Sequence, residues 1–248
     1  MQRKSSSPKA TSKDDAPTVG VKTLAVDIGG SGIKVMVLDE NGTPLTERNR
    51  HETPQPAKPQ PIVDIIAELA KTQGEFDRIS VGFPGVVHEG VVYTAPNLDP
   101  SWAHFDLGKT LESLLNKPVR VANDADVQGY GVIEGRGVEL VLTLGTGLGS
   151  ALFVDGRLVP NLELGHHPFR KGFTYEEQVG RIALDEVGKK RWNRRVRRMI
   201  KLLDKIINYR TLYLGGGNAK KIEGDLPPNV RIASNEAGLL GGIALWRY

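Results

Sequence analysis

Three glycine-rich segments and two aspartates have the residue types and spacing that phosphate chemistry requires. The glycines lie in segments 29–32, 145–149 and 215–217, each next to a run of aliphatic residues. Glycine lets backbone N–H groups approach an oxyanion closely. An aspartate at a neighbouring strand end, such as Asp27 or Asp124, can bind a metal ion or accept a proton from a hydroxyl. In this order the segments favour a phosphoryl-transfer enzyme.

The first glycine segment combines a carboxylate, N–H donors and a cation. Asp27 precedes the glycines and Lys34 follows them, and a magnesium-bound phosphate needs these three kinds of group in one small volume. We expect Asp27 to bind the metal as well as the donor. A tight hairpin without a ligand is the alternative for the same residues. The predicted donor-binding residues here are Asp27, Gly29, Gly30, Ser31, Gly32 and Lys34.

The second and third glycine segments predict further donor contacts. Three alternating glycines in 145–149 favour a backbone that touches a ligand, although a flexible β-turn has the same composition. A strand-to-helix junction alone would also explain 215–217. We predict donor contacts at both, because three such segments together are more specific than any one. The residues are Gly145, Thr146, Gly147, Gly215 and Gly216.

Asp124 is the predicted general base. It follows Asn123 at the end of a short β-type run and opens a helical stretch, so a plain helix N-cap is the alternative for the pair. An aspartate at the cleft end of a strand can orient a hydroxyl and accept its proton as the oxygen attacks phosphorus.

Other polar residues could hydrogen-bond a polyol. Asn97 lies in a loop, where a turn role is equally consistent with its neighbours. Glu163 and His166 stand three apart, a spacing that suits either a metal ion or sugar hydroxyls. We favour hydroxyls, because no cysteine is present and the adjacent His167 is awkwardly placed for shared ligation.

A dense basic run spans residues 189–205, although the net charge of the chain is only +4. The run is amphipathic at helical spacing, so its charges are either a solvated face or a track for a polyanion. Acidic residues are absent until Asp204, which favours the track. We predict that Arg194, Arg195 and Arg198 bind a phosphate chain.

Composition limits the class of protein. The 248 residues are 39% hydrophobic and 25% charged, as in ordinary globular proteins, and no apolar run reaches the ~20 residues that span a bilayer. The absence of cysteine excludes disulfides and thiolate metal sites. Residues 1–20 resemble a disordered tail and no export signal, so we expect a cytoplasmic protein that binds neither membrane nor nucleic acid.

The elements that must position these residues follow from hydrophobic spacing and turn signals. Two strands enclose the first glycine segment, and the same pattern recurs around the second. This predicts two related β-hairpin-plus-helix lobes facing a cleft. The predicted elements are strands 21–28 and 33–38, a weak strand from Leu45, a helix across 62–69, strand 78–83, helix 106–115, strand 119–122, helix 125–133, strands 139–144 and 151–154, a helix carrying Trp192 to Ile207, strand 211–214 and helix 236–246.

Six motifs, taken together, resemble the ROK family of sugar kinases and, within it, the polyphosphate glucokinase branch. They lie at 27–34, 82–85, 123–126, 144–149, 163–166 and 214–217. The resemblance runs from about Val21 to the C-terminus. It implies an α/β, actin-like ATPase fold of the hexokinase and ribonuclease H type, with a central cleft. The implied lobes are 21–122, completed by a C-terminal helix at 236–248, and 123–235.

The resemblance also implies an activity: transfer of a phosphoryl group from polyphosphate or ATP to O6 of glucose, with Mg²⁺ as cofactor and a homodimer as the assembly. Asp124 then corresponds to the catalytic base. The corresponding sugar ligands are Asn97, Asn123, Glu163, His166 and Glu176.

One departure from the family is informative. Many ROK proteins carry a cysteine-rich zinc motif after the sugar-binding histidine, and this chain has no cysteine, so we expect no zinc. An ATP-only hexokinase of the same family and a non-catalytic sugar sensor are the alternatives. Asp124 and the two phosphate turns argue against a sensor, which needs neither. The sequence leaves glucose and mannose equally open as the hexose.

Overall fold

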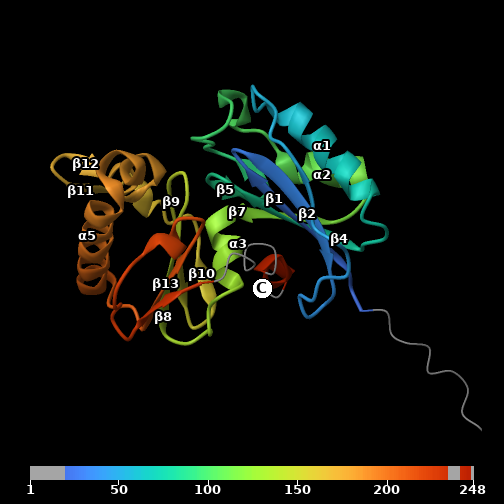
Figure 1. The fold of residues 1–248 in the computed structure, drawn as a ribbon. Helices are drawn as coiled ribbons and strands as arrows, with labels where there is room; N and C mark the ends of the chain where they lie inside the picture. The colour runs from blue at the N-terminus through green and yellow to red at the C-terminus, as the bar shows by residue number, and fades with distance from the viewer. Residues whose placement is uncertain (1–19, 234–240, 247–248) are drawn as a thin grey trace, which may run out of the picture.

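The computed structural model describes residues 20–233 and 241–246 and contains two five-stranded sheets set beside each other (Figure 1). The first sheet has the order β3-β2-β1-β4-β7 and the second the order β10-β9-β8-β13-β14. In the first, the strands are β1 (Thr23–Gly29), β2 (Gly32–Leu38), β3 (Asn49–His51), β4 (Arg78–Phe83) and β7 (Val119–Asn123). In the second, they are β8 (Val138–Leu144), β9 (Leu148–Val154), β10 (Arg157–Val159), β13 (Thr211–Gly215) and β14 (Val230–Ile232).

Both sheets have the same topology. In each, three antiparallel strands are extended by two parallel ones: β1 pairs with β2 and β4, and β8 pairs in the same two ways with β9 and β13. We call the two parts the first and second halves. The duplicated hairpin expected from the sequence is present, and the two glycine turns occupy equivalent places in it.

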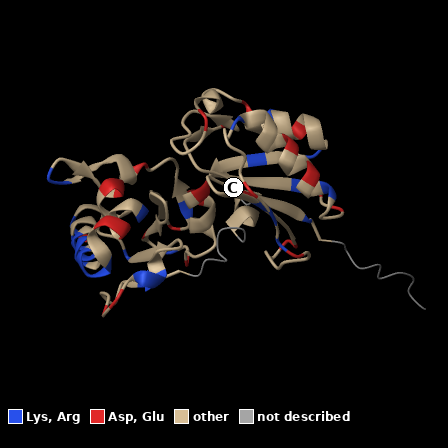
Figure 2. Cartoon of the chain, turned by 45° about the horizontal axis from the view of Figure 1, so that its top comes forward, with Lys and Arg blue, Asp and Glu red and all other residues tan. Residues whose placement is uncertain are grey.

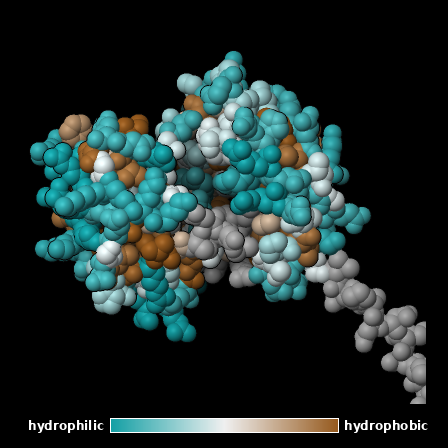
Figure 3. Space-filling view, viewed as in Figure 1, coloured by the Kyte–Doolittle hydropathy of each residue, from teal (hydrophilic) through white to brown (hydrophobic). Residues whose placement is uncertain are grey.

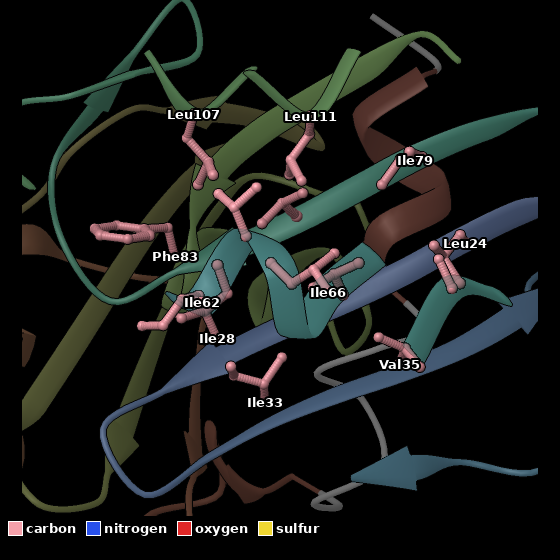
Figure 4. Packing of buried hydrophobic residues seen from close by; sticks show 14 of the residues in the cluster. Leu24, Ile28, Ile33, Val35, Ile62, Ile66, Ile79, Phe83, Leu107 and Leu111 are labelled. Carbon is pink, nitrogen blue, oxygen red and sulfur yellow. The ribbon is translucent and has the colours of Figure 1, made fainter. Parts of the chain in front are cut away.

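The alternation of side chains along β1 explains how the first sheet packs. Leu24, Val26 and Ile28 of β1 point into one core, which also contains residues of two helices (Figure 4). The helices are α1 (Pro59–Lys71), which begins at a proline, and α2 (Leu107–Leu115), which Asp106 caps by accepting a bond from the Lys109 backbone N–H. Strand β1 therefore presents its alternate residues, Asp27 included, to the opposite face.

The opposite face of the first sheet is covered by η4 (Gly241–Trp246), a 3₁₀ helix from the far end of the chain. Ile243 packs against Ala25 there. The Trp246 indole donates to Ser80 Oγ at 2.8 Å and lies between the guanidinium groups of Arg78 and Arg120. Residues 241–246 thus cover part of this face of the first sheet.

Helix α3 (Asp124–Tyr130) packs against strands of both sheets, β4 and β9, so it lies between the halves (Figure 1). The space-filling view shows a hollow between the two halves, bordered on this face mainly by hydrophilic residues (Figure 3). The polar start of α3 follows directly from β7.

The second sheet has its own core against α4 (Tyr175–Val179) and α5 (Arg181–Ile207). Trp192, Val196 and Leu203 are fully buried there, as their spacing predicts. Helix α5 is not continuous, because Gly188 has a left-handed φ of 74° and ψ of 159°. The outer side of α5 remains free for its charged residues.

Some features differ from expectation. The third strand begins at Asn49, because Leu45 is half exposed and donates only one bond, to Val37. Helix 125–133 ends at Tyr130. Two small hairpins were not anticipated: β5 (Val87–His88) with β6 (Val91–Val92), and β11 (Pro168–Arg170) with β12 (Phe173–Thr174). Three short 3₁₀ turns complete the chain: η1 (Pro100–Trp102), η2 (Leu164–His166) and η3 (Ala219–Lys221).

Two expectations concern the termini. The tail 1–20 lies outside the described residues apart from Gly20. Of the expected helix 236–246, residues 236–240 also lie outside them, and the described part, 241–246, is a 3₁₀ helix. Across the described ranges, every helix is too short or too polar to cross a bilayer.

Candidate active site

The β1–β2 hairpin places a carboxylate and an ammonium side by side. Asp27 and Lys34 are register partners, and Lys34 Nζ lies 2.7 Å from Asp27 Oδ2. Both side chains are partly buried, so the pair, near the turn end of the hairpin, is still accessible. Across the parallel pair β1–β4, Asp27 also lies beside Gly82. The structure thus brings together the two charged residues predicted for the first turn.

Asp124 occupies the first position of α3, and its neighbour fixes that position. Asn123 Oδ1 accepts the Ala125 N–H at 2.8 Å, and Asn123 Nδ2 donates to the Gly85 carbonyl at 3.1 Å. The N-cap alternative is therefore correct as a description of Asn123. A methyl group at Gly82 would lie 3.5 Å from Asp124 Cα. Asp124 therefore sits over β4, one strand from Asp27.

The surroundings raise the pKa of Asp124 to about 7. Burial is the main cause, the charge of Asp27 is the next that raises it, and Glu163 adds to it, while the Ala125 N–H opposes them. Burial and like charges disfavour the ionised carboxylate. A base with a pKa near neutrality combines availability at physiological pH with enough basicity to accept a hydroxyl proton.

The second and third glycine segments lie against each other. Gly216 has a φ of +82°, and a side-chain carbon there would come within 2.6 Å of the Leu144 carbonyl oxygen. Asn218 Nδ2 donates to the Gly145 carbonyl at 2.9 Å. Glycine at position 216 is thus required by conformation and by space together. The interaction makes one continuous backbone surface from two segments of the sequence.

Three of the predicted sugar ligands form one cluster beside the second turn. His166 Nδ1 lies 3.4 Å from Glu163 Oε2, in and next to η2. Glu176 Oε2 accepts the Leu148 N–H at 3.0 Å, and a methyl group at Gly147 would lie only 1.9 Å from it. Burial raises the pKa of Glu163, His166 lowers it and Glu176 raises it. The cluster therefore holds closely spaced acidic groups facing the second turn.

Asn97 lies on the other side, in the first half. A methyl group at Gly30 would be 3.7 Å from the Asn97 carbonyl oxygen. The exposed Asn97 side chain is therefore beside the first glycine turn. With this residue, all the predicted sugar ligands lie near one or the other glycine turn, or at the start of α3.

Comparison with known proteins identifies the family of the chain. The sequence pattern described as "ROK family" matches residues 23–177. The chain is 34% identical over 237 residues to the polyphosphate glucokinase of Mycobacterium leprae (strain TN), covering 88% of this chain and 72% of that one. With the polyphosphate glucokinase of Mycobacterium tuberculosis (strain CDC 1551 / Oshkosh) it shares 33% over 254 residues, covering 94% and 95%. The chain belongs to the ROK family.

Solved ROK structures confirm the predicted α/β actin-like fold. The inorganic polyphosphate/ATP-glucomannokinase from Arthrobacter sp. strain KM superposes with a TM-score of 0.82 at 33% identity, covering 91% of this chain and 98% of that one. A ROK family glucokinase from Streptomyces griseus, in complex with glucose and AMPPNP, gives 0.77 at 22% identity and covers 91% and 99%. At that identity the second match shows the fold alone.

The predicted donor-binding arginines lie on a separate surface of this ROK protein. Arg194, Arg195 and Arg198 line a cavity of about 910 Å³. Helix α5, which carries them, lies at the edge of the molecule and is rich in Lys and Arg (Figures 1 and 2). Burial lowers the pKa of Arg195, and the nearby Arg170 adds to this effect. The remaining lining residues are Arg170, Lys171, Arg191, Arg197, Lys201, Leu202, Asp204 and Lys205. We call this the basic cavity.

Sequence reasoning missed two residues that hold the first glycine turn. Arg50 on β3 donates to the Ser31 carbonyl at 2.7 Å, and Thr53 Oγ1 donates to the Gly29 carbonyl at 2.5 Å. Arg50 is the register partner of Lys34, which puts a second cation beside the turn. A strand placed correctly at residues 49–51 would have revealed this pairing.

The described residues contain no group of three or more His, Asp or Glu side chains arranged as a metal site. This is compatible with Mg²⁺, which keeps several waters and usually takes only one or two protein carboxylates alongside substrate phosphates. Asp27 is accessible and uses one oxygen for Lys34. Its second oxygen therefore fits such a role.

Proposed function

We propose that this ROK protein transfers the terminal phosphoryl group of inorganic polyphosphate, or of ATP, to O6 of glucose and forms glucose 6-phosphate. The observation that carries the proposal is the position of Asp124. It opens α3 between the two glycine hairpins, and its pKa is raised to about 7. The mycobacterial relatives are named polyphosphate glucokinases, which supports this acceptor and this donor.

Asp124 acts as the general base. The acceptor hydroxyl lies against its carboxylate, which takes the proton as the oxygen attacks phosphorus. Because the transition state of phosphoryl transfer is loose, most of the acceleration comes from positioning and from charge stabilisation. The base contributes a factor of about 10²–10⁴.

The glycine turns hold the donor. Their N–H groups and the Lys34 ammonium face the phosphate oxygens, and Arg50 stands beside Lys34. Asp27 would hold Mg²⁺, which when bound neutralises charge on the phosphoryl group in flight. Gly215 and Gly216 extend the same surface from the second turn toward the distal part of the donor.

The sugar lies between the halves. Glu163, His166 and Glu176 offer donors and acceptors from the second half, and Asn97 from the first. Asn123 has already used its oxygen and one amide proton, so only its second N–H remains for a hydroxyl. In this proposal lobes 21–122 and 123–235 close about the sugar and exclude water, which limits wasteful hydrolysis of the donor.

The basic cavity supports polyphosphate as a donor. Within the described ranges, none of its Lys and Arg side chains takes part in an ion pair with Asp or Glu. Helix α5 begins at the second glycine turn, because the Arg181 N–H donates to the Thr146 carbonyl at 3.0 Å. Arg191, which lines the cavity, follows ten residues later, just beyond the break at Gly188. A long phosphate chain that ends at the turn could therefore extend along α5 and neutralise the cavity.

A coupled assay tests the proposal. Purified protein with glucose, Mg²⁺ and either polyphosphate or ATP should produce glucose 6-phosphate with both donors, and chelation of the metal should stop the reaction. Product with ATP alone would identify an ATP-only hexokinase. Glucose binding by calorimetry without any product would identify a sugar sensor. Replacing glucose by mannose as the acceptor tests the hexose preference. Light scattering tests the proposed homodimer, and cell fractionation tests the cytoplasmic location.

A further inference from the structure

Asn161 contacts the opposite half from a strained backbone. It lies between β10 and η2 and has a φ of +59°, in the left-handed region where asparagine is tolerated better than most residues. From there its Oδ1 accepts the Val87 N–H at 3.3 Å and its Nδ2 donates to the Val87 carbonyl at 3.3 Å. One side chain thus engages both backbone polar groups of a single β5 residue. We call this pair of bonds the clasp.

The clasp binds a segment of the first half that is also bonded to the N-cap of α3. Val87 follows Gly85 by two residues, and the Gly85 carbonyl accepts a bond from Asn123, the N-cap of α3. Asn161 Nδ2 further lies 3.4 Å from His88 Nδ1. The segment 85–88 of the first half is therefore gripped by two asparagines. One of them adjoins Asp124 and the other precedes Glu163 by two residues.

Asp126 supports Asn161 from below. The residue is 2% exposed, and its burial raises the pKa of the carboxyl to about 7, while the nearby backbone N–H of Asn161 acts to lower it. One carboxylate oxygen is the exceptional feature: among the described residues Asp126 Oδ1 is buried and has no hydrogen-bond partner. Buried carboxylate oxygens are costly to leave unpaired, so such an atom calls for an explanation. Asp126 has no part in the transfer step proposed for Asp124.

The segment after Asn161 is fixed to β9. Ser150 Oγ donates to the Leu162 carbonyl at 2.5 Å and accepts the Leu164 N–H at 3.1 Å. Glu163 lies between these two anchors. A displacement of Asn161 is therefore transmitted to Glu163 over a short and well-restrained stretch of chain.

We propose that Asn161 and Asp126 are positioning residues for the transfer reaction: the clasp ties closure of the first half to the placement of Glu163 and Asp124. Its 3.3 Å bonds are longer than the usual 2.9–3.0 Å, which leaves room for them to shorten as the halves close. The same movement supplies Asp126 Oδ1 with a partner from the Asn161–Glu163 segment. The inference rests on the proposed function for the identity of the sugar, but not for the clasp itself.

Asn161→Gly isolates the clasp. Glycine adopts the positive φ without strain, so the variant removes only the amide group. We expect kcat/KM for glucose to fall on the order of 10- to 100-fold, while the donor KM stays unchanged, because small misplacement of a reactant is costly. Asn116→Gly is the matched control, since Asn116 also has a positive φ, of 50°, but caps α2 on the surface. A folded Asn161→Gly enzyme with unaltered kcat and glucose KM would overturn the proposal.

Asp126 is tested by rescue. Asp126→Asn keeps an acceptor for the Asn161 N–H and Asp126→Ala does not, so the Asn variant should retain most of the activity that the Ala variant loses. The losses of Asp126→Ala and Asn161→Gly should not be additive, because both act through one chain of contacts. Equal losses in the two Asp126 variants, or additive losses in the double variant, would contradict a positioning role.

Hydrogen exchange across the clasped segment tests the clasp without requiring any catalytic activity. In the wild-type protein we expect glucose to slow exchange across residues 85–92, and we expect this segment to exchange faster in Asn161→Gly with or without sugar. Unchanged exchange in the variant would refute the clasp even in an active kinase. Failure of the wild-type protein to phosphorylate glucose with either donor would refute the proposed function, and the exchange measurement would still decide the clasp.

Discussion

Two positions before its turn, the β1–β2 hairpin carries the ion pair of Asp27 and Lys34, whereas the β8–β9 hairpin carries Leu142 and Ser150 at the corresponding register. The sheets around the two hairpins have the same strand order. The repeated topology thus supplies two similar backbone turns, but only the first has a carboxylate and a cation. We infer that charge chemistry belongs to the first hairpin and backbone recognition to the second.

The second half has polar and charged groups of a different kind. Glu176 is bonded to the backbone of its hairpin, and the basic cavity lies on its outer helix. Glu176 thus holds the second turn by a backbone contact, where the first hairpin has an ion pair.

The largest effect should come from the residue between the halves. Asp124→Ala removes the proton acceptor, and kcat should fall by at least ~10²–10⁴-fold. Steady-state kinetics in the coupled assay measures the loss, with glucose affinity by calorimetry as the control for an intact site. Near-normal turnover would remove Asp124 from the mechanism, and with it the reason to place the reaction between the two hairpins.

Removing one polar group from each hairpin, both at the register two positions before the turn, tests the comparison directly. Asp27→Asn should reduce kcat/KM on the order of 10²-fold, because it removes the proposed metal ligand and the partner of Lys34. Ser150→Ala at the equivalent register should cost no more than about tenfold, through lost hydrogen bonds to segment 162–164. Comparable losses in the two variants would show that the hairpins are functionally equivalent.

Stability distinguishes two adjacent glycines of the second half. Gly216→Ala forces alanine to a φ of +82° and against the Leu144 backbone, so the free energy of unfolding should fall by about 2–4 kcal/mol. Gly217→Ala meets no atom within 4 Å and should change stability by less than about 1 kcal/mol. Denaturant titration measures both. Equal effects would mean that the third segment is not held by backbone contact with the second turn.

The basic cavity should affect one substrate only. Replacing Arg194, Arg195 and Arg198 by Ala should raise the KM for long-chain polyphosphate on the order of tenfold and flatten its salt dependence, since fewer charges then meet the polyanion. The glucose KM should not change. Arg181→Ala and Lys189→Ala are matched controls on the same helix, because both side chains are in ion pairs and do not line the cavity. An equal rise of the polyphosphate KM in the control variants would mean that the cavity does not bind the polyanion and that its charges only face solvent.

The smallest predicted effect is a shift of a pH profile. Asp124 must be deprotonated to accept a proton, so with a pKa of about 7 the value of kcat/KM should rise with pH up to about 7 and level off above it. Removing a neighbouring negative charge stabilises the carboxylate, so Asp27→Asn should move this rise to lower pH. If the residual activity of Asp27→Asn had the pH profile of the wild-type protein, the charge of Asp27 would not affect the pKa of Asp124.

Much of this arrangement follows from local sequence. Strands 23–29, 32–38, 78–83 and 138–144 have apolar runs bounded by glycine or polar turns, and residues with strong local signals were placed correctly. Asp124, Glu163 and the glycine segments could be selected because their types suit phosphate and sugar chemistry. Their assembly at one cleft was implied by the family resemblance, and the roles assigned to them remain predictions.

Other features depend on contacts between distant segments. Asn161 and Val87 are far apart in the sequence, and neither residue type predicts the interaction. The same holds for Arg50 on the first turn, because a strand of only three residues gives little periodic signal. Nor could helical spacing show that the α5 arginines lie on the outer surface, since one amphipathic pattern fits many orientations of a helix.

The packing of Trp246 between Arg78 and Arg120 has a consequence for the order of folding. A ribosome releases all of the β strands of the first sheet long before residues 241–246 emerge, and N-terminal domains commonly fold as they are made. Here one face of that early sheet stays uncovered until residues 241–246 have been made. Nascent chains halted before residue 241 should therefore expose Ala25 and Met36, and chaperones that recognise apolar surface should bind them.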